Sequence, residues 1–401
     1  MSCARVPRNA LKICDLTQFY SPASGGVKRY VGEKIAWMRR HRPDWQHVLI
    51  VPGAETRQSG DATARVHEIR APMISRSTQY RALLNLPAVS NVIEEEHPDL
   101  IECSDPYQLA WRAQNTGRSL GIPVVGYYHS HFAEAYVQPL ARKLFGDLGA
   151  QLTMDLARRY TRHTYNDFDR TLVPSPALAA ILREWGVNNV EVAELGMDSG
   201  KFFFSDDSAA SARREFGIPE NVCLLLYLGR LAPEKNVATL LEAFGELHRR
   251  RPGRFHLLVA GDGNYRAEVT ALRESTGAVS WQPEISGNQL PRLYRAADLF
   301  VHPGVLETFG LVTLEAQACG TPVCGIRGSR MDRIVFAGLD DWALENSPAS
   351  LADAIERMSA RDLRTMGRAA AAEVAARYDW TAAFERIFTI YEKVILRRRR
   401  S

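Results

Sequence analysis

The feature that most constrains this chain is an alternation of short apolar runs with segments of helical periodicity. The clearest run, Val222–Leu228, is apolar at almost every position, as a strand buried on both faces of a sheet must be. After it, Val237, Leu240 and Phe244 recur at helical spacing. The same order repeats along the chain. It predicts an α/β protein with parallel sheets built from strand–helix–strand units.

Further strands and helices follow the same reasoning. Strands are expected at Leu11–Leu16, His47–Val51, Leu100–Cys103, Ile122–Tyr128, Arg170–Val173, Val190–Leu195, Phe255–Ala260, Val279–Trp281 and Leu299–His302. Helices are expected from about Val27 and Tyr265, at Leu290–Ala297 and Leu311–Cys319, and at about Thr381–Leu396. With 401 residues, the chain suits two domains. We expect them at residues 1–197 and 198–380, joined by a turn at Gly196–Lys201, with a final helix at 381–401.

Composition narrows the function. The formal charge of +4 is too small to predict nucleic-acid binding, although residues 1–170 hold 22 basic against 17 acidic side chains. The six cysteines are scattered without metal-ligand spacing, which favours free thiols in a reducing compartment. No apolar run is long enough to span a bilayer, and the N-terminus lacks the apolar core of a signal peptide. We expect a cytoplasmic protein whose membrane contact, if it has any, is peripheral.

Polar residues collect where the predicted strands end, which is where ligands bind in open parallel sheets. Arg230 and Lys235 follow one strand, and such cations would stabilise the charge that grows on a departing diphosphate. The alternative is two solvated loop charges, with Glu234 or another acid as the ion-pair partner. Asp262 and Gly263 follow the next strand.

Glu307 and Glu315 flank the start of a predicted helix. Glu307 should lie in the preceding loop and Glu315 one turn inside the helix. Between them, the backbone amides of Phe309, Gly310 and Leu311 would form an anion site at the helix N-terminus. The alternative is an exposed Glu307, with Glu315 interacting only with the helix dipole.

Two weaker signals lie in the first half. Gly25 and Gly26 precede a helix and could approach a phosphate, but they lack the GxGxxG spacing of a dinucleotide site. A glycine turn made for packing is equally consistent. His129 and His131 follow an apolar strand, where one could face a cleft. No third ligand lies nearby in the sequence, so no metal site is predicted.

Taken together, these residues resemble the retaining glycosyltransferases of family four, which have the GT-B fold of two Rossmann-like domains facing each other across a deep cleft. The resemblance rests on Gly229–Asn236, on Gly261–Gly263 with Arg266, and on Glu307–Val323, which carries two glutamates separated by seven residues. In the first domain, Gly25–Arg29, His129 and Gly196–Asp198 are similar to weaker family motifs. The chain departs from the family pattern at Gln282-Pro283 and at Arg327–Arg333.

The resemblance implies a role for each residue. The second domain would bind a nucleotide sugar, UDP-hexose or GDP-mannose, and the first would bind the acceptor, with the final helix crossing back to it. Arg230 and Lys235 would bind the diphosphate. Glu307 would hold the sugar hydroxyls, and Glu315 the ribose. The donor site would also include Gly26, Gly263 and the amides of Phe309, Gly310 and Leu311. His129 would lie near the reacting centre. The family needs no metal cofactor.

The acceptor is less constrained. The resemblance extends to His129–Tyr136, which is similar to family members that glycosylate membrane lipids, so a lipid or lipid-linked glycan is one hypothesis. The first domain carries basic residues at Lys28, Arg29, Lys34, Arg39, Arg40, Arg42, Arg142, Lys143, Arg158, Arg159 and Arg162. The later ones are interspersed with apolar side chains, namely Leu140, Leu144, Phe145, Leu148, Leu152 and Leu156. That pattern indicates either contact with an anionic membrane or a helix packed on its own domain. The competing acceptors are a soluble small molecule and a polysaccharide. The competing functions for the whole chain are a non-catalytic nucleotide-sugar-binding subunit and an epimerase.

Overall fold

The structure is a computed structural model that describes residues 10–20, 26–74, 79–129, 138–205, 209–285 and 287–400. The chain divides into two compact units. Unit 1 comprises Met1–Leu195 together with Trp380–Ser401, and unit 2 comprises Gly196–Asp379. The boundaries expected from the sequence were 197/198 and 380/381. Among the described residues, no helix has both the length and the hydrophobicity needed to cross a bilayer.

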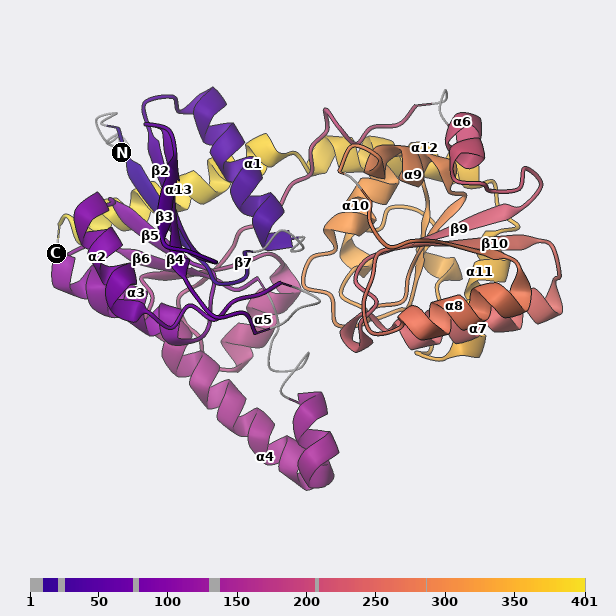
Figure 1. Ribbon diagram of the computed structural model, residues 1–401, viewed down its shortest axis with the longest axis horizontal. Coiled ribbons are helices and arrows are strands. Elements are labelled where there is room, and N and C mark those ends of the chain that lie inside the picture. The colour runs from indigo at the N-terminus through magenta and orange to yellow at the C-terminus, as the bar shows by residue number, and fades with distance from the viewer. Residues whose placement is uncertain are drawn as a thin grey trace. The chain divides into compact units, whose positions relative to one another are not determined.

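Unit 1 is built on an eight-stranded sheet of order β3-β4-β2-β1-β5-β6-β7-β8, parallel except for β3 (Figure 1). Its elements are β1 Lys12–Leu16, α1 Gly26–His41, β2 Gln46–Gly53, β3 Arg57–Gly60, β4 Ala64–Arg70, α2 Leu86–Glu96, β5 Leu100–Cys103, α3 Gln108–Leu120, β6 Val124–Tyr127, α4 Gln138–Asn166, β7 Arg170–Val173, α5 Pro176–Glu184, β8 Val190–Val192 and α13 Trp380–Arg398. The sequence analysis missed β3 and β4. Strand β3 is exposed at every residue and so lacks an apolar signal.

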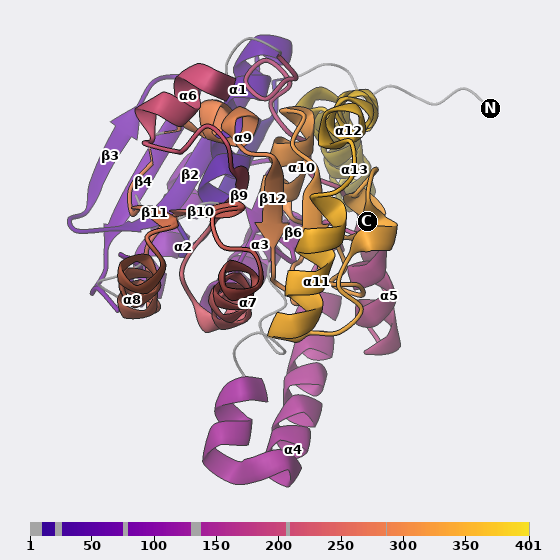
Figure 2. The same cartoon turned by 90° about the vertical axis from the view of Figure 1, so that its right-hand side faces the viewer.

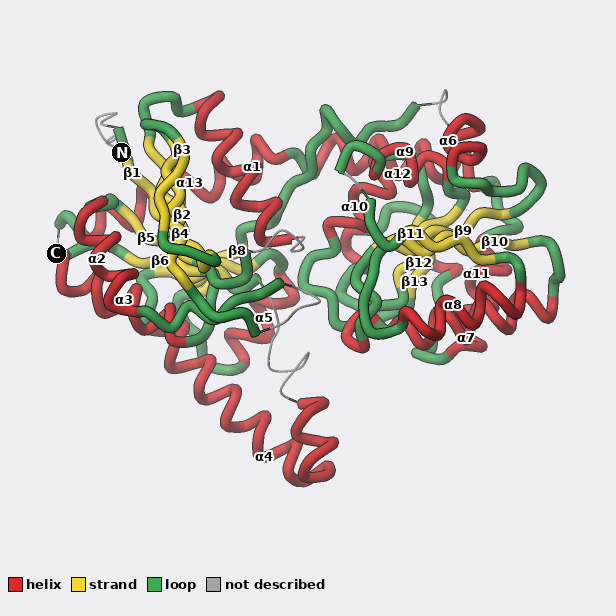
Figure 3. Tube along the Cα trace, viewed as in Figure 1, coloured by secondary structure: helices red, strands yellow, loops and turns green. Residues whose placement is uncertain are grey.

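Unit 2 has a five-stranded, wholly parallel sheet of order β11-β10-β9-β12-β13 (Figure 3). Its elements are α6 Ala209–Glu215, β9 Cys223–Leu228, α7 Val237–Arg250, β10 Phe255–Ala260, α8 Arg266–Thr276, β11 Val279–Gln282, α9 Leu290–Ala296, β12 Leu299–His302, α10 Leu311–Ala318, β13 Val323–Gly325, α11 Pro348–Met358 and α12 Leu363–Arg377. Helices α7, α8 and α11 cover one face of this sheet, and α9, α10 and α12 cover the other. The predicted α/β class with parallel sheets is therefore confirmed.

The sheet of unit 1 separates two cores of different character. On β1, Cys14 and Leu16 point into an apolar core with residues of α2, α3 and α5. The alternate residue Asp15 points to the other face, where α1 and α13 pack. The last helix of the chain is thus part of the first unit's core: Phe384 and Tyr391 of α13 are fully buried there.

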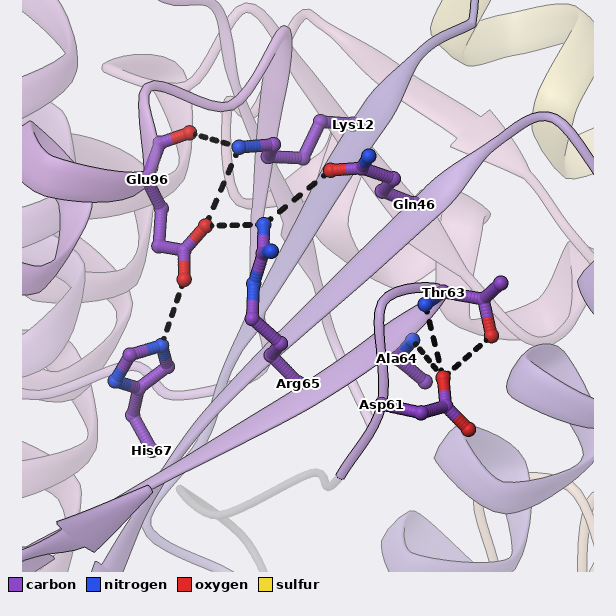
Figure 4. A network of polar contacts seen from close by, with 8 residues as sticks. All are labelled: Lys12, Gln46, Asp61, Thr63, Ala64, Arg65, His67 and Glu96. Carbon is purple, nitrogen blue, oxygen red and sulfur yellow. Dashed lines mark hydrogen bonds and ion pairs between the residues drawn. The ribbon is translucent and has the colours of Figure 1, made fainter. Parts of the chain in front are cut away.

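The amino ends of β1, β2 and β4 hold a separate polar network (Figure 4). The Glu96 carboxylate at the end of α2 accepts hydrogen bonds from Lys12 Nζ at 3.2 Å and Arg65 at 2.6 Å, and its other oxygen lies 2.9 Å from His67 Nε2. Arg65 also donates to Gln46. Burial would raise the pKa of Glu96, but its hydrogen bonds and Arg65 lower it. Because ligands bind at the carboxyl ends of parallel strands, this network lies at the opposite edge, and we assign it to stability.

Candidate active site

The candidate site of unit 2 lies at the topological switch point of its sheet, between β9 and β12, where the strand order reverses. The chain leaves β9 toward β10 on one side, and it leaves β12 toward β13 on the other. The loops after β9 and β12, two adjacent strands, therefore diverge at their carboxyl ends. Such a switch point is the usual ligand site of an open parallel sheet.

An ion pair joins these two loops. Lys235 ends a short 3₁₀ turn, Pro233–Lys235, and its Nζ lies 2.7 Å from Glu307 Oε2 in the loop after β12. The Lys235 side chain is 29% exposed and that of Glu307 15%, so water or a ligand can reach both groups. His302, the last residue of β12, places its Nε2 3.4 Å from the same carboxylate oxygen.

Electrostatics keep Glu307 ionised. Burial alone would raise the pKa of this carboxyl group. The positive charge of Lys235, together with the hydrogen bond and charge of His302, outweighs burial and holds the pKa well below its ordinary value. The carboxylate can therefore accept hydrogen bonds from sugar hydroxyls at any physiological pH.

Asn236 fixes the geometry of this ion pair. Its backbone is left-handed, with φ of 55°, which asparagine tolerates better than most residues. Its Nδ2 donates to the carbonyl of Pro303 at 2.9 Å, and its Oδ1 accepts from Thr239 at 2.8 Å. These bonds tie the loop after β9 to the loop after β12. The sequence analysis gave no role to Asn236 or His302, although His302 could have been found from its place at a strand end.

Gly263 has a structural role that the sequence did not reveal. The loops after β9 and β10 run in close contact, and Leu231 and Gly263 form an isolated parallel bridge. A Cβ at Gly263, where φ is 155°, would lie 2.4 Å from the carbonyl oxygen of Leu231. A Cβ at Gly261 would lie 2.1 Å from the carbonyl oxygen of Gly229. These glycines let two strand-end loops touch, whatever contact Gly263 also makes with a donor.

Arg230 forms an ion pair within its own loop. Its guanidinium lies 2.9 Å from the Glu234 carboxylate, the local partner considered as the alternative from the sequence. The Arg230 side chain is nonetheless 41% exposed, and the hydroxyl of Tyr227 holds its backbone by donating to the Arg230 carbonyl at 2.8 Å. An anionic ligand can therefore reach this guanidinium.

The helix after Glu307 presents its N-terminus at the same edge of the sheet. Gly310 caps α10 in the left-handed conformation, with φ of 89°, and as a glycine it offers no side chain to the amides of the first turn. A Cβ at Gly310 would lie 3.3 Å from Met331, in the arginine-rich loop that departs from the family pattern. Arg333 of that loop lies 5.1 Å from the ring centre of Phe309. The amides at Leu311 and the nearby cation favour a bound anion.

Glu315 lies on the buried face of α10. It is 1% exposed, and its Oε2 accepts a hydrogen bond from the hydroxyl of Tyr294 at 3.0 Å. From the sequence, Glu315 was expected either to bind the ribose or to interact with the helix dipole, and Tyr294 was not expected as its partner. The predicted ribose contact stays a prediction, and it would require the carboxylate to share its oxygens between Tyr294 and a ligand.

The candidate residues of unit 1 are Gly26 and His129; Gly25 and His131 lie outside the described residues. Gly26 is the first residue of α1, and there is open space where its Cβ would be. The His129 ring stacks on Tyr127 with centroids 4.0 Å apart. Burial, and then the charge of Lys34, lowers the pKa of His129 to about 3, although Asp15 acts in the opposite direction. His129 is therefore neutral at physiological pH.

Asp105 was also missed. It follows β5. This strand is adjacent to β1, and the strand order in the sheet of unit 1 reverses between the two. The residue is fully buried, and its Oδ2 accepts a hydrogen bond from the Gln18 backbone at 2.8 Å. Burial raises the pKa of Asp105 to about 7 despite the hydrogen bonds from Gln18 and Thr17. The strand-end rule that selected His129 would also have selected Asp105.

The buried interior of unit 1 contains a second lysine–carboxylate cluster. Lys34 of α1 is wholly buried, with its Nζ 2.8 Å from Asp15 and 3.0 Å from Glu102. Its ammonium also donates to the hydroxyl of Tyr391 on α13 at 3.2 Å. Lys34 was counted in the basic excess of the first domain, but it contributes nothing to surface charge. Among the described residues, no group of three or more His, Cys, Asp or Glu side chains could hold a metal ion.

Comparisons with known proteins agree on a family. Residues 208–373 match the family described as glycosyl transferases group 1, and residues 24–201 match glycosyltransferase family 4. The chain is 30% identical over 368 residues to a GDP-mannose-dependent alpha-(1-6)-phosphatidylinositol dimannoside mannosyltransferase of Mycobacterium tuberculosis, covering 90% of this chain and 91% of that protein. It is 27% identical over 345 residues to a GDP-mannose-dependent alpha-mannosyltransferase of Corynebacterium glutamicum, covering 84% of this chain and 77% of that protein.

Solved structures agree on the fold. Sucrose-phosphate synthase of Thermosynechococcus elongatus superposes with a TM-score of 0.74 at 20% identity, over 96% of this chain and 99% of that one. HepE of Anabaena, in complex with UDP and glucose, superposes with a TM-score of 0.71 at 20% identity, over 96% of this chain and all of that one. At this identity, the likeness concerns the fold alone, which is GT-B.

Proposed function

This chain belongs to glycosyltransferase family 4, and we propose that it transfers mannose from GDP-mannose to a hydroxyl group of a lipid-linked acceptor, with retention of the anomeric configuration. The observation that carries the proposal is the Lys235–Glu307 ion pair at the switch point of unit 2. A cation and a carboxylate at this point match the two ends of a nucleotide sugar: a diphosphate and a hydroxyl-rich ring.

The donor is proposed from both the site and the relatives. Lys235 and Arg230 supply two exposed positive charges, and the start of α10 supplies amide donors. The two relatives named above are both described as GDP-mannose-dependent, which favours GDP-mannose over a UDP-hexose. The charges are supplied by side chains, so we propose that transfer needs no metal ion.

The proposed reaction breaks the bond between mannose C1 and the β-phosphate oxygen, and it forms a bond from C1 to the acceptor oxygen on the same face. The acceptor proton passes to the leaving phosphate. Lys235 and Arg230 stabilise the charge that grows on that phosphate, an interaction stronger in the transition state than in the ground state. Glu307, released from Lys235 when the phosphate takes its place, accepts hydrogen bonds from sugar hydroxyls. His129, neutral because of its low pKa, is proposed to contact the donor sugar.

The acceptor class is proposed from the mycobacterial relative. That relative is named for a phosphatidylinositol dimannoside, which is a glycolipid. A soluble small molecule or a polysaccharide is the competing acceptor class, and a direct comparison of the two distinguishes them.

The first experiment measures the thermal stability of the protein with GDP-mannose, UDP-glucose and each free nucleotide. A ligand at a hundred times its Kd stabilises the folded state by about 2.7 kcal/mol, so the correct donor should raise the melting temperature clearly. We expect GDP-mannose to do so and UDP-glucose not to. A shift with UDP-glucose alone would reject the proposed donor.

The second experiment follows radiolabelled mannose into lipid extracts and into water-soluble acceptors, with and without a chelator. Glu307→Gln should abolish transfer, whereas the matched control Glu356→Gln, a partly exposed carboxylate paired with Arg251 outside the site, should retain it. Label found only in water-soluble products would replace the lipid acceptor with the alternative. Full activity of Glu307→Gln would overturn the site.

A further inference from the structure

Three exposed leucines mark one face of α4. Gly146, with φ of 70° and ψ of −170°, interrupts this element, and the helix that follows it projects away from the sheet of unit 1 (Figure 2). Leu148, Leu152 and Leu156 occur four residues apart and are 72%, 60% and 65% exposed. Residues at this spacing share one helix face, here over about 12 Å at 1.5 Å per residue.

The opposite face of the same helix is the one that packs. Met154, Ala157 and Tyr165 are buried, and Met154 and Tyr165 belong to the apolar core with α2 and α3. The sequence left open whether the leucines of this segment pack on their own domain. For Leu148, Leu152 and Leu156 they do not. The side chains of Leu140, Leu144 and Phe145 lie outside those that the structure describes.

Arginines and a tryptophan border the leucines. Arg158, Arg159 and Arg162 follow within two turns and line a surface hollow of about 380 Å³ together with Trp185, Asp155 and Glu184. The Arg158 guanidinium lies 5.8 Å from the ring centre of Trp185. Its distance to the Asp155 carboxylate is 3.5 Å, which is long for an ion pair. Across the whole of α4, five basic side chains stand against two carboxylates.

We propose that the leucine face of α4 docks on an anionic lipid bilayer, with Leu148, Leu152 and Leu156 entering the acyl boundary and the three arginines contacting lipid phosphates. Basic residues and a tryptophan beside an inserted apolar face are typical of interfacial helices.

A second copy of the chain is a poorer occupant. Three leucines over two turns offer much less than the roughly 1,200 Å² that a stable protein interface buries. The flanking arginines of two copies would also face like charges, whereas phosphates neutralise them. The surface stands on its own observations. Its use, which is to bring unit 1 to a lipid acceptor, rests on the proposed function.

The test is the retention of the full-length protein on sedimented vesicles, either of phosphatidylcholine alone or with phosphatidylglycerol added. We expect retention only with the anionic lipid, and less of it as salt rises. Replacing the leucines together (Leu148→Ser, Leu152→Ser and Leu156→Ser) should lower the partition coefficient at least tenfold. Replacing Arg158, Arg159 and Arg162 by Gln should lower it on the order of a hundredfold.

Matched controls lie elsewhere on the chain. Leu84→Ser and Leu344→Ser remove leucines that are 62% and 76% exposed, and both should bind vesicles as the unmodified protein does. Replacing Arg250, Arg251 and Arg254 by Gln removes three arginines of unit 2 and should also leave retention unchanged. Stabilisation by GDP-mannose, measured on every variant, reports separately on the proposed function.

The outcomes separate the two proposals. Vesicle binding that survives the leucine replacement would overturn the docking surface, even if the donor still stabilises the protein. So would a change from dimer to monomer, in analytical ultracentrifugation of the leucine variant, without a loss of vesicle binding. A protein that binds vesicles as expected but is not stabilised by GDP-mannose would keep the surface and reject the proposed donor.

Discussion

The two units each bring a lysine against a carboxylate and a histidine, but they expose these groups to very different degrees. In unit 1, Lys34 and Glu102 are completely buried, and Asp15 also lies 2.9 Å from His47 Nε2. In unit 2, the Lys235–Glu307 pair with His302 is partly open to solvent. The two clusters use the same types of side chain, but they differ in burial and in the number of partners around the lysine.

Burial decides what each cluster can do. A buried ion pair must satisfy all its groups internally, and Lys34 does so with two carboxylates and the hydroxyl of Tyr391. Burial lowers the pKa of Lys34, but Asp15 and Glu102 outweigh it and raise the pKa above its ordinary value, so the ammonium stays charged. No ligand can replace these partners without unfolding the core. Lys235 and Glu307, reached by solvent, can exchange partners, as a donor site requires.

The largest expected effect concerns stability in unit 1. Lys34→Met would leave the carboxylates of Asp15 and Glu102 buried without their cation, and removing one partner of a buried pair costs about 3–5 kcal/mol. The measurement is chemical denaturation of the full chain. If the variant is as stable as the unmodified protein, the Lys34 cluster does not stabilise unit 1. If Lys34→Met cannot be purified, the stability of Tyr391→Phe, which removes another partner of Lys34, is measured instead.

The corresponding change in unit 2 should affect the reaction instead. We expect Lys235→Met to lower the transfer rate about 10²–10³-fold, as the loss of one preorganised charge typically does. Its free energy of unfolding should fall by less than that of Lys34→Met, because Lys235 is partly exposed and His302 stays beside the Glu307 carboxylate. The transfer rate and the free energy of unfolding are measured on the same preparation of Lys235→Met. A stability loss as large as that of Lys34→Met would erase the contrast between the clusters.

The third prediction concerns pH. The pKa of His129 is about 3 in the folded protein, whereas an unfolded histidine titrates near 6.5. As the pH falls from about 6 to 4, the unfolded state binds the proton and the folded state does not, so stability is lost by up to about 1.4 kcal/mol per pH unit. His129→Phe, which keeps a ring to stack on Tyr127, should remove this part of the slope. An unchanged slope would show that His129 is not buried in its neutral form.

The smallest effect is expected for Tyr391→Phe. The variant removes one hydroxyl that contacts Lys34 and Glu102 but leaves the ion pairs in place. A hydrogen bond to a charged group contributes about 1.5–3 kcal/mol, and we expect a loss at the lower end of that range. Denaturation of single and double variants with Lys34→Met should give non-additive losses. Additive losses would mean that α13 is held by its apolar face alone.

Much of the fold was readable from the sequence because burial leaves a periodic signal. Strands such as Val222–Leu228 and Phe255–Ala260 are apolar at almost every position, since helices cover both faces of their sheet. The exposed strand β3 and helices α11 and α12 were not predicted. The edge strand has no apolar pattern, and no motif drew attention to the helices.

What the sequence determined by itself was the order of elements and the types of residue at the strand ends, because backbone periodicity and local turns are short-range properties. It could not decide that Lys34 is enclosed while Lys235 is open, or that the leucines of α4 face outward. Both depend on which distant segments cover a side chain, and solvent access, unlike periodicity, is a property of the whole tertiary structure. That access separates a structural ion pair from a candidate active site.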